Sequence, residues 1–260
     1  MLGAIAGDII GSIYEHHTIK TTDFPLFGKG CAATDDSVLT IATADALMGN
    51  GDFARHFRSY ARRYPNAGYG GMFLAWMAGD NAGPYNSFGN GSAMRVSPVG
   101  WFAESREDAL NLAAGTAAVT HNHPEGIKGA QATALAIWLA RNKASGEDIS
   151  RAITGNFGYD LSAPVARIRE TYRFDVTCQG SVPQALRCAL EAGSYEEAVR
   201  MAVSLGGDAD TQACIAGAVA EALLGLPEDI AERAMTYLDG DLRSVAKRFR
   251  KRHVIPTSAM

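Results

Sequence analysis

The chain has 260 residues, of which 47% are hydrophobic, and its formal net charge is −4. This length and apolar content are sufficient for one large domain with a sizeable core. Because the sequence has no excess of basic residues to neutralise phosphates, its composition argues against a general nucleic-acid binder.

The N-terminal segment, MLGAIAGDIIGSIYE, is apolar enough to imitate a signal peptide. It lacks a basic start, however, and Asp8 interrupts its apolar run. No stretch reaches the roughly 18 uninterrupted apolar residues of a membrane span. No pair of the four cysteines has the Cys-x-x-Cys spacing of a redox or zinc motif, so we expect reduced thiols. We therefore expect a soluble, cytoplasmic protein that has no membrane partner.

Helical periodicity governs most of the sequence. Residues 36–49 combine a broad apolar face with Gly49 as a stop signal. Residues 52–64 place aromatic side chains on one stripe and arginines on the other face, and Pro65 ends this helix. Residues 124–141 open with a proline and are apolar almost all round. Further helical patterns cover residues 106–119, 147–154, 163–172, 181–192, 195–204, 210–224, 228–238 and 241–252.

Strand signals are nearly absent, and the Asn50–Gly51 pair joins two helical patterns instead of two strands. We predict an all-α fold, a single compact orthogonal bundle of about a dozen helices over residues 1–260, with 255–260 as a loose tail. Segments 15–35 and 80–98 are the least regular. Loops of this length in a compact domain are often functional.

Two acidic clusters stand at predicted helix starts. They consist of Thr34, Asp35 and Asp36, and of Asp208, Asp210 and Thr211. Helix capping alone explains either cluster taken singly, because threonine and aspartate favour N-caps and acids favour the first turn. Both clusters, however, hold more acids than capping requires. The preceding Gly206–Gly207 pair indicates a close backbone approach.

If the two helix starts meet in space, four carboxylates converge. Their mutual repulsion would raise the pKa of at least one of them unless a cation intervenes. Ligand sets made only of oxygen select hard ions such as Mg²⁺ or Mn²⁺. Six protein oxygens are too many for one Mg²⁺, which keeps several waters, whereas two ions about 3.5–4 Å apart would use them.

These motifs resemble the ADP-ribosylglycohydrolase family, which includes the dinitrogenase-reductase-activating glycohydrolases and the ADP-ribosyl-acceptor hydrolases. The resemblance covers most of the chain, and its motifs follow the family's order: GAIAGDIIGSIYE, TDDS, SFGNGSAMRVSP, THNHPEG and GGDADT. One departure is TDDS, where the family often has TDDT. The fourth residue of that motif, Ser37, is not among the expected ligands.

The resemblance implies an all-α fold that holds two Mg²⁺ or Mn²⁺ ions in a central cleft. It implies that both acidic clusters are the metal ligands: Thr34, Asp35, Asp36, Asp208, Asp210 and Thr211. Glu15 matches the family's glutamate on a mobile loop near the metals. Taken alone, Glu15 has the pattern of a solvated loop carboxylate. With the resemblance, we expect Glu15 to sense the ribose or orient the attacking water, and Glu15 or Asp35 to accept its proton.

The glycine-rich stretch NSFGNGSAMR is typical of an anion-binding turn, although such turns are common. In the family's context we expect it to cradle the diphosphate, with backbone amides from Ser87, Phe88 and Gly89 and with Asn90 bonding nearby. Phe88 is also expected to flank the sugar or the base. In THNHPEG, a third nitrogen or sulfur ligand is lacking, so we expect no metal pair. The resemblance suggests that His121 binds a ribose hydroxyl or a phosphate, whereas His123 is expected to cap the next helix.

The expected reaction is hydrolysis of a glycosidic bond of ADP-ribose, through a transition state that resembles an oxocarbenium ion. Two alternatives stay open: a dinuclear nucleotide phosphoesterase and a catalytically silent ADP-ribose binder. The expected partner is an ADP-ribosylated substrate. The sequence indicates neither the acceptor, which could be arginine, serine, a nucleobase or a small molecule, nor the oligomeric state.

Overall fold

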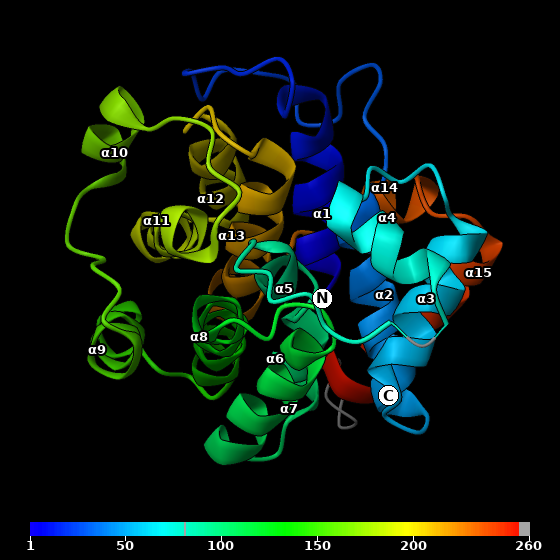
Figure 1. Ribbon diagram of the computed structural model, residues 1–260. Helices are drawn as coiled ribbons and strands as arrows, with labels where there is room; N and C mark the ends of the chain where they lie inside the picture. Colours follow the sequence, from blue (N-terminus) through cyan, green and yellow to red (C-terminus); the bar gives the residue numbers. More distant parts are fainter. Residues whose placement is uncertain (81, 255–260) are drawn as a thin grey trace.

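The computed structural model describes residues 1–80 and 82–254, and it confirms the all-α prediction (Figure 1). The predicted loose tail, residues 255–260, lies outside the described residues. The elements are α1 (Leu2–Gly11), η1 (Ser12–Tyr14), α2 (Asp35–Met48), α3 (Phe53–Arg63), α4 (Gly71–Ala78), α5 (Gly91–Met94), α6 (Ser97–Phe102), α7 (Arg106–Ala118), α8 (Pro124–Arg141), α9 (Gly146–Phe157), α10 (Val165–Thr171), α11 (Cys178–Glu191), α12 (Tyr195–Val203), α13 (Ala209–Leu224), α14 (Glu228–Thr236), α15 (Gly240–Phe249) and the π-helical turn η2 (Arg250–Val254).

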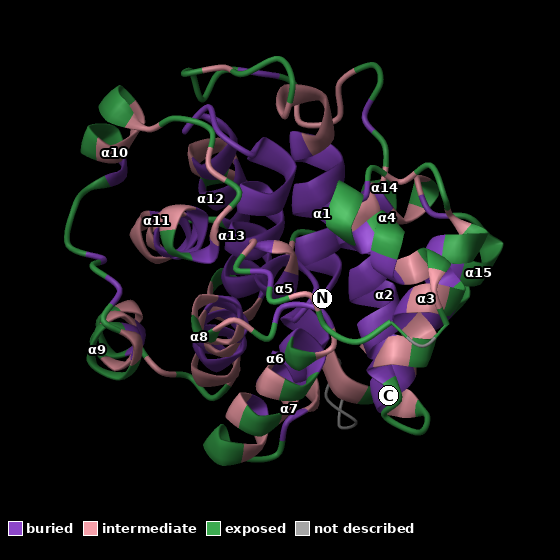
Figure 2. Ribbon diagram, in the orientation of Figure 1, coloured by how far each residue is buried: buried purple, intermediate pink, exposed green. Residues whose placement is uncertain are grey.

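Helices α1 and α13 form the centre of the bundle (Figure 1). Every residue of α1 is buried, as is every residue of α13 from Ala209 to Glu221, whereas α3, α9 and α15 each keep an exposed face (Figure 2). The two central helices carry mostly alanine, glycine and other small apolar side chains, so they have no polar face to turn to water. The longer apolar side chains of the surrounding helices complete the core around them.

Glycines bring α1 and α13 into backbone contact. A Cβ atom on Gly3, Gly7 or Gly11 would overlap, respectively, the carbonyl oxygens of Gly217, Ala213 and Ala209. Because the contacts run in opposite directions along the two helices, the helices are antiparallel. This places the end of α1, and the chain that follows it, beside the start of α13. Glycines recur every four residues in the first helix, and this spacing lets the N-terminal segment pack beside the second acidic cluster.

Substitution of Gly7 by Ala is expected to lower the free energy of unfolding by about 2 kcal/mol, because the added methyl group overpacks this contact. Gly155→Ala in α9 is the matched control. A Cβ there meets nothing within 4 Å, so alanine should stabilise the helix by about 0.5–1 kcal/mol. Urea denaturation of both variants measures the difference. Equal effects at the two positions would contradict the close approach of α1 and α13.

The long predicted helices are confirmed, with ends that shift by a few residues. The predicted helix at 181–192 begins earlier, at Cys178, because the Thr177 side chain accepts a hydrogen bond from the Gly180 amide. Three short helices, α4, α5 and α6, were not predicted. Within residues 1–80 and 82–254 there is no strand, and the extended segments meet only in an isolated antiparallel bridge between Gly89 and Thr177. None of the described helices combines the length and the apolar character needed to cross a bilayer.

Candidate active site

One cavity of about 520 Å³ collects the two acidic clusters, although more than 170 residues separate them in the chain. The first cluster comes from the start of α2 and the second from the start of α13. The predicted ligands that line this cavity are Thr34, Asp35, Asp36, Asp208, Asp210 and Thr211, and Glu15 lies with them. The two helix starts therefore meet in space, as the predicted convergence of four carboxylates requires.

Direct contacts join the clusters. The Thr211 hydroxyl donates to Asp36 Oδ1 at 3.4 Å, which links α13 to α2. Glu15, Asp208 and Asp210 each offer a carboxylate oxygen, and these three atoms lie within 4.8 Å of one another. The antiparallel contact of α1 with α13 explains how Glu15 arrives there, because it follows α1 by only one 3₁₀ turn.

Asp8, to which the sequence analysis assigned no role, fixes the first cluster in place. Its buried carboxylate accepts hydrogen bonds from the Thr34 amide at 3.0 Å, the Thr34 hydroxyl at 2.6 Å and the Ser37 amide at 3.1 Å. The Ser37 hydroxyl also donates to it. Asp8 thus ties α1 to the start of α2. The signal for it was an aspartate inside an otherwise apolar helix, because such a charge is rarely buried without partners.

Helix capping occurs at the first cluster, but it does not explain the position of Asp208 in the second cluster. Thr34 caps α2 as predicted, since its side chain accepts a hydrogen bond from the Asp36 amide at 3.3 Å. Asp208 stands at the N-cap position of α13, but its side chain accepts no capping hydrogen bond there. It instead accepts one from Asn90 Nδ2 at 2.7 Å. The side chain of Asp208 is therefore positioned for the cavity.

Four carboxylates of the cavity resist ionisation in the absence of a cation. Burial, and next the charge of Asp8, raise the pKa of Asp35 to about 8. Burial and neighbouring carboxylates raise the pKa of Asp36 and of Asp210 well above the ordinary range. Burial and the charge of Asp208 also raise the pKa of Glu15. Crowding of this kind stabilises the protonated forms unless a positive charge is bound.

The donor set fits hard divalent cations. All the donors are carboxylate or hydroxyl oxygens, which are the ligands that Mg²⁺ and Mn²⁺ prefer. Moreover, Asp36 Oδ2 is buried and has no hydrogen-bond partner among the described residues. A buried carboxylate oxygen without a partner is costly in an empty site and is accounted for by a bound cation.

The segment after Glu15 is anchored at two points. Lys20 Nζ donates to the carbonyl oxygens of Arg169 and Tyr172, each at 2.9 Å, and also to that of Leu205. Arg200 Nη1 donates to the carbonyl oxygens of Thr22 and Phe24. These contacts hold the loop against α10 and against the connection between α12 and α13. The half-buried Glu15 carboxylate is thereby kept at the cavity rim.

The glycine-rich loop supplies one side of the cavity, and it differs from the run of free amides that we expected. Ser87, Gly89 and Asn90 line the cavity, but Phe88 does not, and it is 45% exposed. The amides of Ser87, Gly89 and Asn90 already donate to Thr120 O, Ser87 Oγ and Val176 O. The difference arises because the loop pairs with the segment before α11. Of the three amides expected to hold a diphosphate, that of Phe88 has no acceptor within the described chain.

The two histidines of THNHPEG lie in different surroundings, and the predicted capping role of His123 is confirmed. His123 Nδ1 accepts a hydrogen bond from the Glu125 amide at 3.1 Å and so caps α8. His121 is buried and lines the cavity, and burial lowers its pKa well below the ordinary value. Sequence reasoning missed Tyr85, which also lines the cavity, with its ring centroid 5.9 Å from that of His121. The sequence signal for Tyr85 was the presence of an aromatic residue in the irregular segment 80–98.

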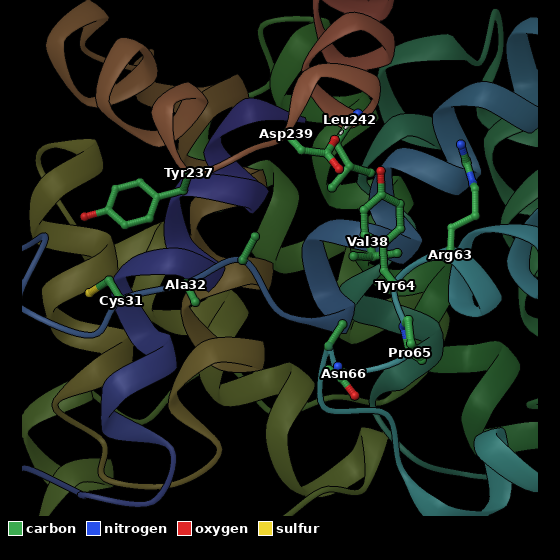
Figure 3. A pocket seen from close by; sticks show the side chains of 12 residues that line it. Cys31, Ala32, Val38, Arg63, Tyr64, Pro65, Asn66, Tyr237, Asp239 and Leu242 are labelled. Carbon is green, nitrogen blue, oxygen red and sulfur yellow. Dashed lines mark hydrogen bonds between the residues drawn. The ribbon is translucent and has the colours of Figure 1, made fainter.

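Figure 3 shows a second cavity, of about 480 Å³, that shares a lining residue with the first. Ala67 lines both, and its carbonyl oxygen accepts a hydrogen bond from the Asp35 amide at 2.7 Å. The one carboxylate among its lining residues is Asp239, which faces Tyr64 and accepts a hydrogen bond from the Leu242 amide at 2.9 Å. This carboxylate caps α15, and no other carboxylate among the described residues lines the second cavity. The second cavity therefore lacks the set of oxygen donors found in the first.

Comparisons with known proteins give a family match and relatives that cover most of the chain. The family model described as ADP-ribosylglycohydrolase matches residues 1–256. ADP-ribosylhydrolase ARH3 of Homo sapiens is 25% identical over 327 residues, covering 93% of this chain and 90% of the human protein. ADP-ribosylarginine hydrolase Tri1 of Pseudomonas putida (strain GB-1) is 26% identical over 258 residues, covering 87% of this chain and 70% of that protein. A solved structure described as an ADP-ribosylglycohydrolase-related protein complex has a TM-score of 0.69 and 25% identity, covering 96% of this chain and 95% of its own.

Proposed function

Because the chain belongs to the ADP-ribosylglycohydrolase family, we propose that it uses two divalent cations, Mg²⁺ or Mn²⁺, to release ADP-ribose from an ADP-ribosylated acceptor. The observation that carries the proposal is the meeting of two threonine–aspartate clusters in one cavity. The buried, unpartnered Asp36 Oδ2 supports it further, because a cation would satisfy this atom.

The residues of the cavity take separate roles in this proposal. The two clusters would hold the cations, and Asn90 keeps Asp208 in place. When bound, such a pair would orient the ribose hydroxyls and lower the pKa of a nearby water. Glu15, whose pKa is raised, would orient the attacking water and accept its proton, and Asp35 is the other candidate acceptor. The Phe88 amide, the Ser87 hydroxyl and His121 would bind the remote part of the substrate, so that its binding energy fixes the anomeric carbon.

The deciding experiment is product analysis with ADP-ribose attached to arginine, serine, a nucleobase or a small molecule, each incubated with Mg²⁺ or with EDTA. We expect free ADP-ribose from at least one substrate with Mg²⁺ and none with EDTA. Release of phosphate or AMP would instead support a phosphoesterase. Binding of ADP-ribose without any product would support a silent binder, and full activity in EDTA would contradict the role of the metal.

Glu15→Ala is expected to lower the turnover number about 100-fold while leaving the affinity for ADP-ribose within about three-fold, because a general base acts mainly in the transition state. Steady-state kinetics and calorimetric titration measure the two quantities. Asp23→Ala, which removes an exposed acid of the same loop, is the control. A change in affinity alone would assign Glu15 to substrate binding.

The stabilisation by Mg²⁺ is expected to increase between pH 6 and pH 8. The pKa of Asp35 is about 8 in the folded protein without metal, above its value in the unfolded chain, and those of Asp36 and Asp210 are raised as well. The folded metal-free protein therefore binds more protons than the unfolded chain, so its stability falls as the pH rises towards 8. Cations replace these protons, so the rise in Tm on adding Mg²⁺ should be larger at pH 8. A larger rise at pH 6 would contradict the assignment.

A further inference from the structure

A buried chain of hydrogen bonds runs along the wall of the first cavity, which Arg95 and His121 both line. Arg95 is fully buried, and its guanidinium lies 4.4 Å from the centre of the Phe57 ring. It forms no ion pair with an acid among the described residues. Instead, its Nη2 donates to the Thr116 carbonyl oxygen at 2.8 Å and to the Thr120 hydroxyl oxygen at 2.7 Å. One nitrogen of the arginine, Nη2, therefore holds the chain at the end of α7, whereas Nε and Nη1 have no hydrogen-bond partner among the described residues.

The hydroxyl of Thr120 continues this chain to His121, since its oxygen lies 2.7 Å from His121 Nδ1. A guanidinium can only donate, so the bond from Arg95 occupies a lone pair of the Thr120 oxygen and leaves the hydroxyl proton free. The Tyr85 hydroxyl is also a hydrogen-bonding neighbour of Thr120, and a neutral tyrosine hydroxyl can donate to the second lone pair of the Thr120 oxygen. With Arg95 and Tyr85 as the two donors to this oxygen, the hydroxyl proton is directed to Nδ1, 2.7 Å away, which then carries a lone pair.

The other ring nitrogen faces the cavity. His121 Nε2 lies against Gly89 and Gly91, both of which line the cavity, and it has no protein acceptor within residues 1–80 and 82–254. Burial and the charge of Arg95 lower the pKa of His121 well below its ordinary value, so the ring is neutral near pH 7. A neutral imidazole with a lone pair on Nδ1 carries its proton on Nε2.

We propose that Arg95 and Thr120 are positioning residues that hold His121 as the Nε2–H tautomer, so that His121 can only donate a hydrogen bond to an oxygen of the bound ADP-ribose group. The identity of the ligand rests on the proposed function, but the tautomer does not. The arrangement gives His121 one defined role. Its Nε2 has no lone pair with which to take a proton, so His121 recognises an acceptor oxygen and does not serve as a base.

The first test needs no variant. We expect ¹⁵N NMR of the ligand-free, histidine-labelled protein to show an unprotonated Nδ1 and a protonated Nε2 for His121, with its signals identified by their loss in His121→Gln. A protonated Nδ1 would overturn the proposal even if the enzyme hydrolyses ADP-ribosylated substrates. Conversely, the expected tautomer in a protein that releases no ADP-ribose would count against the proposed function and leave this inference standing.

The second test removes the hydroxyl. In Thr120→Val we expect His121 to lose the predominance of the Nε2–H form and the Kd for ADP-ribose to rise about ten-fold, because a buried bond is left unmade. Thr120→Ser keeps the hydroxyl and should restore the wild-type NMR signature. Thr116→Val is the matched control, since the Thr116 hydroxyl one turn earlier donates to Ala113 O. An unchanged tautomer in Thr120→Val would overturn the proposal, and the wild-type spectrum decides if that variant does not fold.

Discussion

Asp208→Ala is expected to abolish hydrolysis, with a fall in kcat/KM of about 1,000-fold or more, because loss of a cation ligand removes several kcal/mol of charge stabilisation. The same variant should fold normally. Asp208 makes no capping bond at α13, and its charge is one of those that raise the pKa of Asp35, Asp36 and Asp210. Its removal therefore relieves repulsion in the metal-free protein.

Three measurements separate this outcome from unfolding. Activity with Mg²⁺ gives the loss of catalysis, urea denaturation in EDTA gives the stability, and the change in Tm on adding Mg²⁺ gives the metal dependence. We expect the stability in EDTA to be unchanged or higher and the effect of Mg²⁺ to be strongly reduced. Asp229→Ala, which removes an exposed acid from the first turn of α14, is the control. A fully active Asp208→Ala enzyme would remove the basis for the two-cation site.

Asp8→Ala should cost the most stability, about 3 kcal/mol, although Asp8 does not line the cavity. The carboxylate accepts four hydrogen bonds at the start of α2, and its loss strands the buried amides of Thr34 and Ser37. The first acidic cluster then loses its support. We therefore expect a lower urea midpoint and a smaller rise in Tm on adding Mg²⁺.

Ser37→Ala provides a graded comparison, because it removes one of these four donors and leaves three. Its expected cost is about 1 kcal/mol, with most of the Mg²⁺ effect retained. If Asp8→Ala lost stability but kept the full Mg²⁺ response, Asp8 would be important for folding alone. Equal costs for the two variants would contradict the central position of the Asp8 carboxylate.

The long helices could be predicted because their periodicity is local. The pattern at 124–141 needs only its own side chains and its opening proline, and the structure has α8 over Pro124–Arg141. The short helix α6 could not be predicted, since its stability comes from packing. Gly100 of α6 lies directly against Ile137 of α8, a contact that only the folded chain creates.

The residues of the site also fall into two groups, those that a single segment of sequence predicts and those whose role depends on the fold. Thr34 and Asp210 were predictable as ligand candidates, because an excess of acids at a helix start is visible in a single segment. Asp8 and Thr120 were not, because the function of each depends on a partner brought to it by folding: the start of α2 for Asp8, and Arg95 for Thr120. The apolar neighbours of Asp8 show that its carboxylate needs partners but not which ones, and no neighbouring residues in the chain give a signal for Thr120.

The sequence by itself determined the all-helical class, the chemical types of the donors and the family resemblance, since composition, periodicity and short motifs carry these properties. Only the tertiary structure decided that the two clusters share one cavity, that Asp8 supports one of them and that the amides of Ser87 and Gly89 are already used. The physical reason is that a hydrogen bond or a shared charge depends on distances of a few ångströms between atoms. The antiparallel contact of α1 with α13 sets these distances for residues far apart in the chain.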